Sequence, residues 1–136
     1  MADLSITAAN VAPAANAVLL TGTLAATSTQ GQPVYLGTSD RLLYIADGNV
    51  SAATALVVGI LVTGGSVNQP ATYIVWGDID LGATLTLAEI YCLSDVAGAI
   101  RPEGDNATGD FVTVLGVATA TNNLRIGILA SGVQVP

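Results

Sequence analysis

The chain has 136 residues, of which 51% are hydrophobic, 10% charged and 4% aromatic, and its formal net charge is −7. The basic side chains are three scattered arginines, and the chain has neither His nor Lys. This balance excludes a nucleic-acid-binding protein, which needs clustered cations, and it disfavours an anionic membrane surface. The length suits one domain that builds its own core without metals or disulfides.

Residues 1–17 are expected to form an extended N-terminal arm. The segment is rich in Ala and Asn, and its apolar residues are too sparse for a core-facing helix. Pro13 favours an extended conformation at Ala12. The alternative is a frayed terminus. The N-terminus lacks the basic and apolar blocks of a secretory signal, and no apolar run reaches the ~20 residues of a membrane span. We therefore expect synthesis in the cytoplasm.

From residue 18 the sequence predicts short strands separated by turns rich in Gly, Asn and Asp. The expected strands cover residues 18–24, 32–36, 41–45, 56–62, 72–76, 83–87, 90–94, 99–102, 111–118 and 124–129. Short strands at spacings of roughly 8 to 12 residues are typical of a β-sandwich or barrel. No long amphipathic helix is predicted. We therefore expect an all-β fold, a small β-barrel or β-sandwich, with residues 18–136 as a single β-rich domain.

A faint internal repeat accompanies these strands. Residues 34–36 (Val-Tyr-Leu) resemble residues 90–92 (Ile-Tyr-Cys), and residues 58–61 resemble residues 115–118. The offsets are 56 and 57 residues. A duplication of about 31–63 and 88–120 is therefore a hypothesis.

The sequence predicts no catalytic, cofactor-binding or metal-ligating residues. Nucleophilic catalysis usually needs a His or Lys base beside the nucleophile, and zinc prefers Cys and His ligands. Cys92 is the only cysteine and lies in an apolar run, which favours a small buried side chain over a reactive thiol. No Gly-rich phosphate-binding motif is present. We therefore expect a protein that is not an enzyme and has no cofactor.

Two acidic clusters leave one alternative open. The first contains Asp78 and Asp80, and the second contains Glu103, Asp105, Asn106 and Asp110. Both lie beside glycines, where Asp is typical of turns. Whether either cluster binds a cation is left open, because Ca²⁺ takes six to eight oxygen ligands. A glycosidase with paired carboxylates is the enzyme alternative.

Three segments resemble the small β-rich head decoration proteins, also called capsid cement proteins, of tailed bacteriophages. They are residues 31–36 (Gly-Gln-Pro-Val-Tyr-Leu) with residues 58–60 (Val-Gly-Ile), residues 109–118 (Gly-Asp-Phe-Val-Thr-Val-Leu-Gly-Val-Ala), and the opening residues 1–7. The resemblance covers most of the chain. It implies a barrel or tulip-like fold, a homo-oligomer with a trimer favoured, and the major capsid protein as partner. It also implies a place on the outer capsid surface of the virion, where the protein stabilises the shell.

From this resemblance we expect the arm to contact the capsid through its larger apolar residues, Leu4, Ile6, Val11 and Pro13. An arm that orders only on the shell binds weakly by itself, whereas three linked arms on a trimer bind tightly. The alternatives are another virion component, such as a head-fibre base or a tail protein, and a non-enzymatic β-sandwich binding module.

Overall fold

The computed structural model describes residues 3–136, so Met1 and Ala2 of the expected arm lie outside the described residues. The prediction of a small all-β barrel or sandwich is confirmed, because strands dominate and the helices are two single 3₁₀ turns, η1 and η2. In chain order the elements are η1 (Ala8–Asn10), β1 (Val11–Pro13), β2 (Val18–Thr23), β3 (Pro33–Leu36), β4 (Leu43–Ile45), β5 (Gly59–Leu61), β6 (Pro70–Leu81), β7 (Ile90–Leu93), β8 (Ile100–Pro102), η2 (Glu103–Asp105), β9 (Phe111–Ala118) and β10 (Asn123–Gln134).

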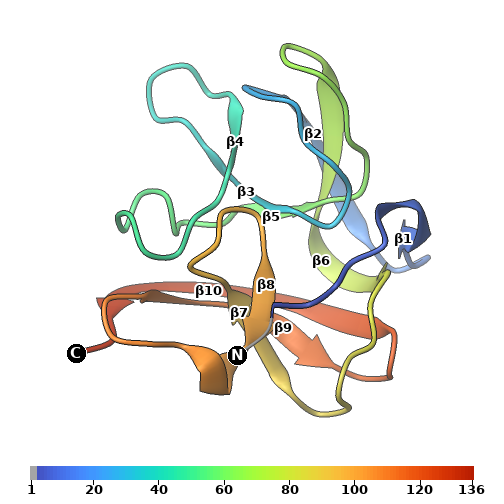
Figure 1. The fold of residues 1–136 in the computed structure, drawn as a ribbon. Helices are drawn as coiled ribbons and strands as arrows, with labels where there is room; N and C mark the ends of the chain where they lie inside the picture. The colour runs from blue at the N-terminus through green and yellow to red at the C-terminus, as the bar shows by residue number, and fades with distance from the viewer. Residues whose placement is uncertain (1–2) are drawn as a thin grey trace.

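The strands form one curled antiparallel sheet with the order β4-β3-β5-β6-β10-β9-β7-β8, and β1 and β2 also pair with β6. In Figure 1 the strands β10, β9 and β7 form the lower layer, and β2 to β5 form the upper part. The long strand β6 belongs to both parts. Its N-terminal half pairs with β2 and β5, and its C-terminal half pairs with β1 and β10.

Gly77 marks the point where β6 passes from one set of partners to the other. Its φ is +96°, in the left-handed region that glycine adopts without strain. A Cβ at this position would lie 2.6 Å from the carbonyl oxygen of Asn16. The segment between β1 and β2 therefore passes directly over Gly77, and only a residue without a side chain fits beneath it.

The strands β3–β6 and β7–β10 form two units with the same pairing pattern. In the first unit Val34 pairs with Gly59, and 57 residues later Tyr91 pairs with Gly116 in the second. The hairpins β3–β4 and β7–β8 correspond at the same offset. The repeat noticed in the sequence at offsets of 56 and 57 therefore has a structural counterpart at 57 in β3, β4 and β5, whereas β6 and β10 correspond at an offset of 51.

Two clusters of buried side chains make up the core. The smaller cluster lies within the first unit, and its members are Leu24, Val34, Leu43, Leu61, Ala71 and Tyr73. The larger cluster combines side chains of both units, among them Ile60 and Ile74 of the first and Tyr91, Leu115 and Leu124 of the second. The second unit is therefore packed against the first through a shared core.

The N-terminal segment differs from the expected arm, because it packs on its own domain. Val11 is only 8% exposed, and Leu4 and Ile6 pack against the larger core cluster. The backbone N–H of Leu4 donates to the carbonyl of Ile100 at 2.8 Å. Pro13, the fourth expected anchor, pairs with β6 in the strand β1 and is exposed. Three of the four expected capsid anchors are thus engaged within the chain.

Two expectations about the strands around residues 77–87 are wrong. The strand expected to end at Gly77 continues to Leu81, because Gly77 allows the chain to bend without leaving the sheet. Residues 83–87 form no strand despite their alternating pattern. The chain turns at Gly82 and Ala88, both with positive φ, so this segment faces no neighbouring strand over its length. Alternation here reflects the buried Leu85 between exposed neighbours.

Candidate functional site

The first acidic cluster was expected at a turn, but it lies within the strand β6. Asp78 accepts a bond from Arg125 Nε at 3.1 Å and from Asn16 Nδ2 at 3.0 Å. Asp80 accepts from the backbone N–H of Gly82 at 3.0 Å and from Asn122 Nδ2 at 3.2 Å. These carboxylates tie β6 to the N-terminal segment and to β10. Both carboxylates accept hydrogen bonds from donors within the chain, as carboxylates with a structural role do.

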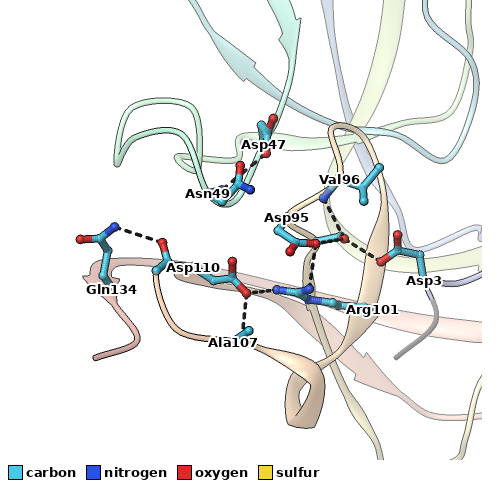
Figure 2. Close-up of polar contacts among 11 residues, drawn as sticks. Asp3, Asp47, Asn49, Asp95, Val96, Arg101, Ala107, Asp110 and Gln134 are labelled. Carbon is cyan, nitrogen blue, oxygen red and sulfur yellow. Dashed lines mark hydrogen bonds and ion pairs between the residues drawn. The ribbon is translucent and has the colours of Figure 1, made fainter.

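One member of the second acidic cluster, Asp110, lies beside Arg101, as Figure 2 shows. The Arg101 guanidinium donates to Asp95 at 2.9 Å and also contacts Asp110, and both Arg101 and Asp110 are buried. The backbone N–H of Ala107 donates to Asp110 at 2.8 Å. Asp110 is therefore satisfied by a buried cationic side chain and a backbone N–H, which is the environment of a structural carboxylate.

The remaining members of this cluster do not converge. Glu103 is exposed, and Asp105 and Asn106 each keep one buried oxygen without a hydrogen-bond partner. Over residues 3–136, no group of three or more His, Cys, Asp or Glu side chains is placed to hold a metal ion. Cys92 is buried, and burial raises the pKa of its thiol, which lowers its reactivity. The same residues contain no helix long and apolar enough to cross a membrane.

Asp78 gives a testable pH dependence. Hydrogen bonds from Arg125, and then from Asn16, hold the pKa of Asp78 below its ordinary value of 3.8. A depressed carboxyl pKa stabilises the fold above the unfolded-state pKa, and this contribution is lost as the pH falls through the folded-state pKa. We therefore expect Asp78→Asn to lower the melting temperature by a few degrees at pH 7, and this difference to disappear as the pH falls through the lowered folded-state pKa of Asp78.

Thermal unfolding followed by circular dichroism from pH 2 to 8 measures this difference. Glu103→Gln is the control, because Glu103 is exposed and forms no ion pair among residues 3–136. An equal effect of both substitutions at pH 7, or an Asp78→Asn effect that persists unchanged at pH 2, contradicts the assignment.

The surface offers a stronger candidate than the carboxylates, because large apolar side chains are exposed on the strands. Val18, Leu19 and Leu20 are all exposed on β2, and we call these three residues the β2 edge. Among residues 3–136, β2 pairs with β6 alone, so its second edge has no partner strand. Residues 4–39, which include this edge, contain no charged side chain. Natural edge strands often carry charges or Pro that prevent pairing with another chain, and β2 carries neither, although its pairing with β6 is irregular between Val18 and Leu19.

A second apolar surface lies where β6, β10, β9 and β7 run side by side. Trp76, the only tryptophan, is 61% exposed there, although Trp is usually among the more buried residues. It borders a surface hollow of about 340 Å³, which we call the Trp76 hollow. The hollow is lined mainly by Trp76, Ile90, Val114, Val117, Arg125 and Gly127. Its one charged residue, Arg125, is paired with Asp78.

Neither of these surfaces was identified from the sequence. Two signals pointed to them. Val18, Leu19 and Leu20 are three consecutive apolar residues in a strand, so at least one of them must face away from a single core. Trp76 directly precedes Gly77, where the strand bends. The four expected anchors Leu4, Ile6, Val11 and Pro13 are not brought together with either surface into one site, because the first three pack on the core.

The chain is thus a small all-β protein with two exposed apolar surfaces, the β2 edge and the Trp76 hollow. No known protein family matches the chain, and no curated protein is significantly similar to it.

Proposed function

We propose that this chain is a structural protein of a tailed-phage virion that binds the outer capsid surface and stabilises the shell. Its partners are the major capsid protein and further copies of itself, with a trimer favoured. The observation that carries this proposal is the set of large apolar side chains exposed on rigid strands of an acidic, weakly charged chain. Contiguous exposed apolar patches on soluble proteins mark interaction sites. The resemblance of residues 31–36 and 109–118 to head decoration proteins supports the choice of partner.

The proposal assigns the protein no catalysis. Three acidic side chains that a hydrolase would use, Asp78, Asp80 and Asp110, are bonded to Arg101, Arg125 and amide donors. The contact with the capsid that we favour is the β2 edge, because an extended capsid segment can add to it as a further strand. Backbone bonds along the edge would provide affinity. Val18, Leu19 and Leu20 would provide the apolar contact.

Co-sedimentation with undecorated phage heads tests the proposal. The purified protein is expected to pellet with heads in a saturable manner, at a fixed ratio to the capsid protein. Leu20→Lys, which places a charge on the β2 edge, is expected to weaken pelleting at least tenfold, whereas Leu56→Lys leaves it unchanged. These two leucines are similarly exposed, 49% and 56%.

No pelleting of the unmodified protein at micromolar concentration overturns the proposal. Tubes or rings of the pure protein in electron micrographs would instead favour a tail component. Equal pelleting of Leu20→Lys and Leu56→Lys would leave head binding intact and rule out the β2 edge as the contact.

A further inference from the structure

The two units of the fold, β3–β6 and β7–β10, each have a face built from the same strand positions. This face is buried in the first unit and uncovered in the second. In the first unit Ile60 pairs with Ile74, and both are completely buried in the larger core cluster. Their counterparts in the second unit are Val117 and Arg125, which pair in the same way, but Val117 is only half-buried and Arg125 is exposed. The same strand positions are thus interior in one unit and solvent-facing in the other.

The neighbouring positions repeat this contrast. Pro33 and Val57 of the first unit are buried, whereas their counterparts at an offset of 57 are Ile90, which is 38% exposed, and Val114, which is half-buried. Ile90, Val114, Val117 and Arg125 all line the Trp76 hollow. The hollow therefore occupies the face that the first unit buries against the second. Within the chain, this face of the second unit is left uncovered.

We propose that the Trp76 hollow is the surface through which a second copy of this chain binds, with Trp76 of one copy entering the hollow of its neighbour. This inference names the surface for the homo-oligomer of the proposed function, and it rests on the oligomeric part of that function.

Charge favours a second copy as the occupant. Each copy carries a formal charge of −7, so two copies repel each other over most of their surfaces. The hollow is an exception, because its only charged lining residue is Arg125, whose Nε lies 3.1 Å from Asp78 Oδ1. This ion pair is neutral as a unit. Two acidic copies can therefore meet at this face without bringing acidic side chains into contact.

The shape of the surface also suits self-association. The exposed indole of Trp76 lies beside an opening over Gly127, where an added Cβ would meet no atom within 4 Å. A protruding ring and a vacant hollow on the same face are complementary between copies related by rotation. A pocket of more than about 300 Å³ is large enough for ring systems, and Trp is enriched among the residues that dominate interfaces.

Sedimentation equilibrium of the pure full-length protein, without heads, tests the inference. We expect a closed oligomer at micromolar concentration. Gly127→Leu fills the hollow without backbone strain, because Gly127 is not in the left-handed region. It is expected to raise the dissociation constant at least about 30-fold, and Trp76→Ala to do the same. Gly104→Leu is the matched control, since Gly104 also has open space and is remote from the hollow lining. It should leave association unchanged.

A monomeric unmodified protein at tens of micromolar overturns the inference, as does an oligomer that Gly127→Leu leaves intact while circular dichroism shows a folded chain. If the pure protein is monomeric and Gly127→Leu instead abolishes pelleting with heads, the hollow contacts the capsid protein and the second-copy assignment is wrong. Because heads are absent from the sedimentation experiment, its failure does not bear on capsid binding. Failure to pellet with heads, in turn, leaves the self-association result standing.

Discussion

Deletion of residues 1–17 is expected to leave the chain largely unfolded at room temperature. The deletion removes Val11 from the core together with the partly buried Leu4 and Ile6. Burial of one such side chain contributes about 1.5–3 kcal/mol, so the three together contribute on the order of 4–6 kcal/mol. Domains of this size are stable by about 5–15 kcal/mol in total. The burial term alone is therefore a large part of the stability of the domain, and loss of the backbone pairing between β1 and β6 adds to it.

Urea unfolding followed by circular dichroism measures this effect. Val11→Ala serves as the milder variant, with an expected loss of about 2 kcal/mol from the cavity that it leaves. Pro13→Ala is the control, because Pro13 belongs to the same short strand but is exposed. A truncated protein with the unmodified unfolding midpoint would show that the segment is a detachable arm after all.

This prediction differs from the expectation of an arm that orders only on the shell. Loss of head binding after truncation would follow from unfolding alone and would not identify a contact. Single substitutions on the β2 edge are therefore the more informative test of capsid binding, because Leu20 is exposed.

Arg101→Leu is expected to destabilise the domain by about 3–5 kcal/mol. The substitution leaves Asp110 buried without its cationic partner, and an uncompensated buried charge costs about this much. The double variant Arg101→Leu with Asp110→Leu is expected to recover part of the loss, because it removes both charges. Arg41→Leu is the control, since Arg41 is exposed and forms no ion pair among residues 3–136.

Unfolding midpoints in urea at pH 7 separate these variants. A loss below about 1 kcal/mol for Arg101→Leu, or a double variant less stable than the single one by a further 3 kcal/mol, would contradict the view that the buried charges depend on each other.

The strand content of this fold was largely predictable from local sequence. Phe111–Ala118 was predicted with the observed bounds, because Val, Thr and Leu alternate there between Gly109 and the turn that follows. The sites of most other strands were also predicted, since Gly, Asn and Asp separate them. The local sequence pattern was sufficient to predict a strand's bounds where turn-forming residues directly follow the strand.

The long strand β6 and the packed N-terminal segment were not predictable in this way. Whether Gly77 ends a strand or bends it depends on the segment at Asn16 that passes over it, 61 residues earlier in the chain. Val11 reads as a sparse apolar residue in an Ala-rich stretch, and its burial depends on pairing with Leu81. Both features follow from long-range contacts that periodicity does not encode.

The candidate surfaces could not be predicted for a related reason. Ile60 and Val117 occupy equivalent positions with equally apolar side chains, yet one is buried and the other lies at the surface. Only the stacking of the second unit on the first decides which of the two faces is covered. The sequence alone therefore does not distinguish an apolar residue that contacts a partner from one that packs in the core.

Electron cryomicroscopy of phage heads incubated with the purified protein tests the central claim most directly. Our account predicts additional density for the all-β domain on the outer capsid surface, in copies that contact each other near Trp76 and contact the shell through β2. Heads without additional outer density, at a protein concentration that saturates any binding, would contradict a role as a capsid-stabilising protein.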